Sequence, residues 1–156
     1  MTVRKFRPPN RLGAMIKAKG GLLAKDALAA AEAGVESLRE ATMASLDAQL
    51  AEVDRRFGKD APNRAAEPFE ALYLLASRVI DVSMFVTDTG VDKAAMSLCG
   101  LADSCSEQGA WRWDAVDVHL NALKLLRAMG DQLPSEQREG MLQGLYQVSH
   151  YRPDEA

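Results

Sequence analysis

Several residue classes are scarce in this sequence, and each scarcity excludes a class of protein. Aromatic residues make up 6% of the chain, and there are only two cysteines. Cys99 and Cys105 lie six residues apart, on different faces of a helix, so we expect no disulfide framework and a reduced, cytoplasmic compartment. No apolar run reaches the roughly 18 residues that a membrane-spanning helix needs. The start of the chain also lacks the apolar core of a signal peptide.

Side chains that carry catalytic or metal chemistry are equally sparse. The chain has two histidines, His119 and His150, and they do not combine with the cysteines into a metal-binding pattern. There is no glycine-rich phosphate loop, no readable Ser-His-Asp set and no paired-carboxylate signature. We interpret His119 as a buried or half-buried structural residue and His150 as a surface residue. We therefore expect no metal, no cofactor and no enzymatic activity.

Charge is distributed unevenly along the chain. The net charge is −3, yet residues 1–20 hold six cations and no acid, so the remainder is acidic. We predict a flexible basic arm over residues 1–23, a folded part over 24–151 and a short tail over 152–156. The arm has few cations and one aromatic residue, Phe6, which argues against nucleic acid or a membrane as its partner. We interpret it as a solubilising segment or a partner of the acidic bundle, with an acidic partner protein as the alternative.

Helix-forming residues dominate what is present, and their spacing is helical. Apolar stripes and breakers predict helices over about 25–57, 68–86, 89–107, 114–129 and 135–150. Short connections between successive helices favour antiparallel neighbours. The sequence thus predicts an all-α fold, an antiparallel four-helix bundle with an additional or extended helix. Helix ends are expected at Pro68 in a first turn, Thr89 and Ser135 as caps, and Gly130 as a terminating glycine.

The predicted helix over residues 68–86 is more apolar than one buried face requires. One stripe has core spacing: Phe69, Leu72, Leu75, Ala76, Val79, Val82 and Val86. Further apolar side chains lie outside that stripe: Tyr73, Leu74, Ile80, Met84 and Phe85. Such a helix is either central in the bundle or carries an exposed apolar binding surface.

Two tryptophans and three acidic residues are interpreted as structural or solvent-exposed residues. Trp111 and Trp113 flank Arg112 in a helix connection, and we interpret them as an aromatic lid over one end of the bundle, with peptide docking as the alternative. Asp81, Asp88 and Asp92 have no strand framework to bring them together, so we interpret them as capping or solvent-exposed residues.

The stretch from Leu72 to Cys99 resembles the histidine phosphotransfer (Hpt) family. The family pattern is Leu-Tyr, then Ala-His, a Lys-Gly pair three residues after the His, a glycine-rich stretch and a second helix ending in Ser-Leu-Cys. Here Leu72-Tyr73 begins the segment and Ser97-Leu98-Cys99 ends it, with the distance between them kept. The segments 116–123 and 141–148 are similar to the family's later helices, so the likeness covers roughly residues 27–150. The chain looks most like alphaproteobacterial CheE-like members associated with chemotaxis gene sets.

Three positions depart from the family pattern, and all three carry its chemistry. Ser77 stands at the phospho-accepting His, Ile80 at the Lys and Asp81 at the Gly. A relay needs a labile phosphoramidate, and a serine phosphate is too stable to pass its phosphoryl group to an aspartate. Ile80 supplies no positive charge for the phosphoryl oxygens, and Asp81 would repel them. The resemblance therefore implies a degenerate Hpt domain that has lost relay activity.

Although these three positions have lost their chemistry, the resemblance implies that the docking surface for the receiver domain of a response regulator remains. We expect a non-catalytic protein of two-component or chemotaxis signalling that sequesters a receiver, competes with an active phosphotransfer protein or tethers the receiver to a complex. The expected contact residues surround the degenerate acceptor position: Tyr73, Leu74, Ser77, Arg78, Ile80, Asp81 and Met84. The alternatives are a homo-oligomeric helical module that buries this face in a homodimer and an active phosphotransfer protein that uses His119.

Overall fold

The structure is a computed structural model that describes residues 24–84 and 88–151 of the chain. Its helices are α2 (Ala24–Phe57), the short 3-10 helix η1 (Arg64–Ala66), α3 (Phe69–Ser83), α4 (Val91–Gln108), α5 (Trp113–Met129) and α6 (Ser135–His150). No strand occurs among the described residues, so the all-α prediction is confirmed. The predicted basic arm, the tail, Phe85 and Val86 lie outside the described residues.

The chain divides into two compact units, Met1–Leu38 and Arg39–Ala156, and the boundary falls inside α2. The described part of the first unit is the beginning of α2, where Leu28, Val35 and Leu38 are exposed. The second unit is a helical bundle formed by the rest of α2 and by α3 to α6. No helix in the described ranges combines the length and the apolar character needed to cross a bilayer.

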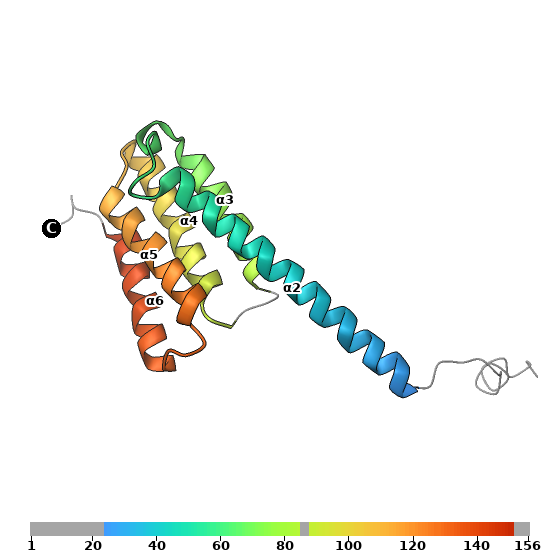
Figure 1. Cartoon of the computed structure of the whole chain (residues 1–156). Coiled ribbons are helices and arrows are strands. Elements are labelled where there is room, and N and C mark those ends of the chain that lie inside the picture. Colours follow the sequence, from blue (N-terminus) through green and yellow to red (C-terminus); the bar gives the residue numbers. More distant parts are fainter. Residues whose placement is uncertain (1–23, 85–87, 152–156) are drawn as a thin grey trace, which may run out of the picture. The chain divides into compact units, whose positions relative to one another are not determined.

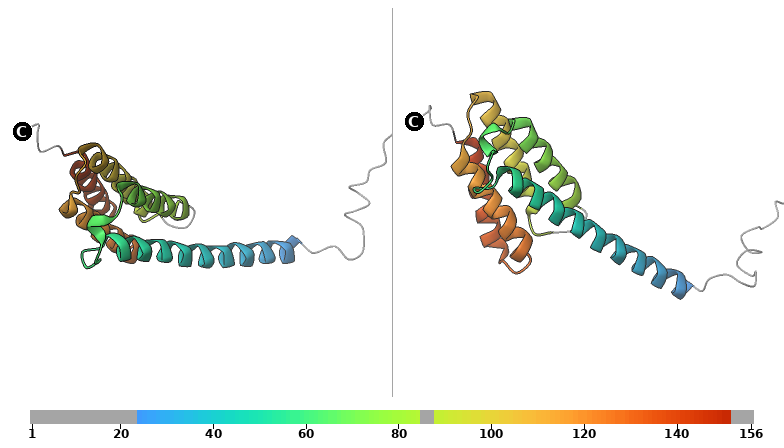
Figure 2. Two further views of the ribbon diagram at one scale, coloured as in Figure 1. Left: turned by 90° about the horizontal axis from the view of Figure 1, so that it is seen from above. Right: turned by 45° about the horizontal axis from the view of Figure 1, so that its top comes forward.

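Helix α4 is the central helix of the second unit. It contacts α3, α5 and α6, and α5 also contacts α6 (Figures 1 and 2). A helix with neighbours on three sides needs small side chains, because large ones would hold those neighbours apart. The sequence meets this need with a series of small buried residues on α4: Ala94, Ala95, Ser97, Cys99, Ala102 and Cys105. The central position thus belongs to α4, and α3 lies to one side of it.

The second half of α2 is part of the bundle core. Leu46, Val53 and Phe57 are fully buried, as their helical spacing predicts. Two ion pairs add to this packing, from Arg127 to Asp47 at 2.7 Å and from Lys124 to Asp54 at 2.6 Å. Both pairs are partly exposed, so the buried apolar side chains contribute most of the stability of this contact.

The helix ends differ from those predicted. Pro68 is the cap residue before α3, one position ahead of the expected first turn. Helix α4 begins after Gly90, which has a left-handed φ of 87°, and Thr89 makes no capping hydrogen bond. Pro134 precedes α6, and Ser135 is its first helical residue, again without a side-chain cap. The predicted Thr89 and Ser135 caps are therefore wrong.

Gly130 ends α5 for a different reason from the one that its sequence position suggests. Its backbone is right-handed, with φ −62° and ψ −31°, so it is not the left-handed glycine that usually terminates a helix. A Cβ atom at this position would lie 2.5 Å from the Cβ of Thr89. The glycine is needed because the turn before α4 packs directly against it.

This close approach yields a stability prediction. We expect Gly130→Ala to lower the free energy of unfolding by about 1–3 kcal/mol, because the new methyl group overpacks the contact with Thr89. The matched control is Gly140→Ala in α6, where a Cβ would meet nothing within 4 Å. That change should instead raise the stability, by up to about 1 kcal/mol, since alanine favours a helix over glycine. Urea unfolding of both variants checks the pair, and equal effects would contradict this account.

Candidate functional site

The outer side of α3 presents most of the predicted contact residues to solvent. Tyr73, Leu74 and Met84 are exposed apolar side chains, and Arg78 and Asp81 are exposed between them. The opposite side of α3 holds Leu72, Leu75, Ala76 and Val79 in the core, as the core stripe predicts. Phe69 and Val82 are partly buried and pack against the same core. Of the two interpretations of this apolar helix, the structure favours an exposed surface.

Ser77 lies where α3 meets α4. It is half-buried, and its Oγ atom is 3.7 Å from the Sγ atom of Cys99. The same sulfur is 3.8 Å from the carbonyl oxygen of Tyr73, one turn earlier on α3. The pair Ser77–Cys99 therefore joins the two helices at the position where the sequence analysis expects a degenerate acceptor.

Ile80 differs from the other predicted contact residues. It is half-buried and packs against the core cluster instead of pointing to solvent. As a direct partner contact Ile80 is therefore a weaker candidate than the exposed residues around it. Core packing explains why this position holds an apolar side chain.

One exposed residue of this surface escaped the sequence prediction. Met96 on α4 is an exposed apolar side chain, and it lies three residues before Cys99. Residues three apart share a helix face. The surface formed by Tyr73, Leu74, Ser77, Arg78, Asp81, Met84 and Met96 is called the α3–α4 face below. Only the pairing of α3 with α4 reveals that Met96 belongs to it.

Neither cysteine has the setting of a reactive thiol. Cys99 and Cys105 are both buried and unbridged. Burial raises the pKa of each thiol, because the thiolate would be poorly solvated there. The expectation that Cys99 packs as a small apolar residue is confirmed.

His119 is fully buried on α5, and both of its ring nitrogens have partners. Nδ1 lies 2.7 Å from the carbonyl oxygen of Ala115, so it carries the proton and donates it to that oxygen. Nε2 then accepts from the hydroxyl of Ser97, at 2.9 Å. The Ser97 oxygen also lies 3.3 Å from that of Ser149 on α6, so the histidine joins three helices. His119 is buried, as predicted, and its side chain has no exposed surface.

His150 is exposed near the end of α6, as predicted. Its ring stacks on that of Tyr146, with 4.0 Å between the ring centroids. Its Nδ1 atom lies 2.9 Å from the Tyr146 carbonyl oxygen.

The two tryptophans cover one end of the bundle. Trp111 contacts the ring of Phe69 at 4.5 Å between centroids and stacks on Trp113 at 4.6 Å. The guanidinium of Arg64 lies 4.5 Å from the centroid of the Trp113 ring and forms an ion pair with Asp117. The predicted aromatic lid is therefore present.

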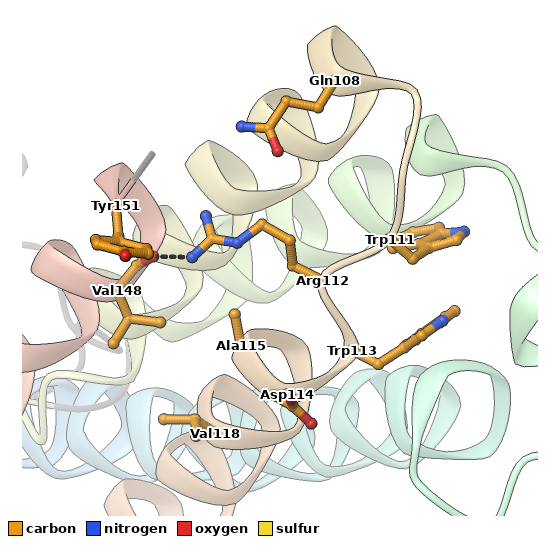
Figure 3. A pocket seen from close by; sticks show the side chains of 9 residues that line it. All are labelled: Gln108, Trp111, Arg112, Trp113, Asp114, Ala115, Val118, Val148 and Tyr151. Atoms are coloured by element: carbon orange, nitrogen blue, oxygen red, sulfur yellow. Dashed lines mark hydrogen bonds between the residues drawn. The ribbon is translucent and has the colours of Figure 1, made fainter. Parts of the chain in front are cut away.

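Beside the lid is an open pocket of about 620 Å³. Figure 3 shows Trp113, Val118, Val148 and Tyr151 around it, with Arg112 crossing toward α6. The Arg112 guanidinium donates to the carbonyl oxygens of Val148, at 2.8 Å, and Ser149, at 3.5 Å. These are among the last carbonyls of α6, which have no partner within the helix. Among the described residues that line the pocket, Arg112 is the one cation, and it serves to cap α6.

Within residues 24–84 and 88–151, no group of three or more His, Cys, Asp or Glu side chains is placed to hold a metal ion. Asp81 and Asp88 are both exposed. Asp92 lies in the first turn of α4, where a negative charge favours the helix dipole.

The setting of His119 predicts a pH dependence of stability. Burial lowers its pKa, as the neighbouring cation Arg112 also does, although the Ala115 carbonyl opposes this. The unfolded chain therefore binds a proton near pH 6.5 that the folded chain does not. The contribution of His119 to the free energy of unfolding is fully present above that pH. It is lost as the pH falls, by up to about 1.4 kcal/mol per pH unit.

Urea unfolding between about pH 7.5 and 5.5, above the range where most carboxylates titrate, checks this slope. His119→Gln should flatten the pH dependence even if it lowers the overall stability. The control His150→Gln should leave the slope unchanged. A slope that survives in His119→Gln would show that another group is responsible.

No protein-family model, curated protein or solved structure matches this chain. The function proposed next therefore depends on the residues and the geometry described above.

Proposed function

We propose that this chain is a non-catalytic, Hpt-like signalling protein whose α3–α4 face binds the receiver domain of a response regulator without relaying phosphate. The helices α3 to α6 would be the antiparallel four-helix core of such a domain, with α2 as the extended helix. The setting would be two-component or chemotaxis signalling in the cytoplasm. The protein would act by sequestering the receiver, competing for it or tethering it.

The observation that carries the proposal is the combination of an exposed apolar surface with a missing acceptor at its centre. Tyr73, Leu74, Met84 and Met96 are exposed on α3 and α4, around the half-buried Ser77. Scattered single apolar residues on a surface are ordinary, whereas several on adjacent helices favour a protein contact. Arg78 and Asp81 provide exposed charges between them, as expected in a surface for a protein partner.

The same surface lacks the groups that a phosphoryl transfer would need. The only polar side-chain partner described for Ser77 is the buried thiol of Cys99, whose pKa is raised. The half-buried Ile80 stands where the family has its cation. A face of this kind supports recognition of a receiver without chemistry.

Binding should be visible as amide shifts when the labelled protein is titrated with a panel of receiver domains, phosphorylated and unphosphorylated. We expect the shifts to cluster at residues 72–84 and around Met96. Leu74→Lys should weaken the binding at least about tenfold, since it places a charge in an apolar contact. Leu125→Lys is the matched control, because Leu74 and Leu125 are 49% and 39% exposed and Leu125 lies on α5.

Two results would contradict the receiver proposal. The first is the absence of shifts at these amides with every receiver of the panel. The second is a dimer that Leu74→Lys converts to a monomer, which would assign the α3–α4 face to self-association.

The proposal also predicts the outcome of a phosphorylation assay. Incubation with a labelled phospho-receiver or with acetyl phosphate should leave no acid-labile label on this chain, because both nitrogens of His119 are occupied inside the bundle. His119→Gln and His150→Gln are the controls. Acid-labile label on the wild type that disappears in His119→Gln would establish an active phosphotransfer protein instead.

A further inference from the structure

Helix α2 carries one apolar stripe, of which only the second half is buried. In that half Leu46, Val53 and Phe57 are fully buried in the bundle. In the first half Leu28, Val35 and Leu38 are 60%, 66% and 69% exposed. The same pattern thus continues from a covered surface onto an open one, which raises the question of what covers the open part.

The exposed part of the stripe has the spacing of a coiled-coil seam. Leu28 and Val35 are seven residues apart, and Leu38 follows three residues later. In heptad terms Leu28 and Val35 occupy the a positions, and Ala31 and Leu38 occupy the d positions. A seam of this kind packs against a second helix with the same repeat.

The residues on the two sides of the seam differ in charge and size. This difference favours one partner helix and one relative orientation of the two helices. One flank, at the e positions, alternates in charge through Lys25, Glu32 and Arg39. The other flank, at the g positions, holds only small residues: Ala27, Gly34 and Ala41. In a parallel pair the e positions would face the g positions, so the charges would have no counterpart.

In an antiparallel pair of identical helices each flank faces its own copy. One register of the two antiparallel helices places Glu32 of one chain opposite Arg39 of the other. The two-fold axis of the dimer then generates the equivalent second pair. The small flanks also face each other and let the backbones approach closely. The charge pattern of this helix is therefore complementary to itself in the reversed direction.

We propose that the first half of α2 pairs in antiparallel orientation with the same helix of a second copy of this chain. In this register Val35 of each chain packs on Leu38 of the other, and two reciprocal Glu32–Arg39 ion pairs form beside this contact. The seam is only about two heptads long, so the dimer is weak and depends on concentration. The inference uses no residue of the α3–α4 face and does not rest on the function proposed for it.

The pairing also accounts for the helical state of this segment. Residues 24–38 include several alanines, which favour a helix, but also Gly34, which opposes it. Isolated helices of this length are marginal in water. Burial of the seam against a second copy would cover side chains that are now exposed and so stabilise the helix.

A charge-swap experiment tests both the partner and the direction. Sedimentation velocity over a concentration series gives the dimer dissociation constant of the full chain. Glu32→Arg and Arg39→Glu should each raise it at least about tenfold, because each places like charges opposite each other twice in the dimer. The double variant restores opposite charges and should return to within about threefold of the wild type.

Two further variants locate the interface. Val35→Lys places a charge in the seam and should abolish the dimer. Glu36→Arg reverses a charge one residue away, outside the seam and its flanks, and should leave the dimer unchanged. Circular dichroism melts confirm that the bundle is intact in every variant.

A wild type that stays monomeric throughout the series would overturn the proposal. So would a dimer that tolerates Val35→Lys, or a double charge swap that fails to restore association. None of these three results affects the receiver proposal, because Leu74 and its neighbours take no part in this seam.

Discussion

The packing around α4 is the constraint from which the rest of the bundle follows. One helix with neighbours on three sides must bury small side chains, and α4 does so with alanine, serine and cysteine. Its neighbours can then approach closely, and each of them needs to bury only one face. For α3 this means that Leu72, Leu75 and Val79 fill the contact with the core. The large apolar residues on its other side remain exposed.

The same constraint explains why polar groups lie near the centre of the bundle. Helix α6 fully buries only Leu145 and Ser149, while Met141, Leu142 and Val148 pack against the core partly buried, so its apolar contact is smaller than that of α4. Hydrogen bonds supply the rest, through the Ser97–His119–Ser149 contact and through Arg112 at the end of the helix. A buried polar group contributes only while its partners are satisfied, so His119 must stay neutral for this arrangement to persist.

The helices were predictable from the sequence, whereas their roles were not. Stripes of Leu and Val mark each helix, and the predicted spans agree with the structure to within a few residues. The central helix was not evident, because most of the buried residues of α4 are too small to raise its apolar character above that of α3. The cap at Thr89 failed because Gly90 and the packing of Gly130 set the chain direction there, and Ser135 is not a cap because α6 begins at it, directly after Pro134. Met96 and the capping role of Arg112 required tertiary neighbours that no local pattern contains.

The proposed receiver contact and the proposed self-pairing use separate residues, which has a consequence for how the protein would act. A dimer joined through α2 carries two α3–α4 faces, so one assembly can hold two receivers or both subunits of a dimeric regulator. When two weak contacts are linked, the second contact forms at a higher effective concentration of its partner. The assembly then binds more tightly without any new interaction. Under the two proposals, the chain would gain from such avidity, because its effect would be set by how much receiver it holds. The proposed receiver contact and the proposed pairing helix would then serve the same binding role.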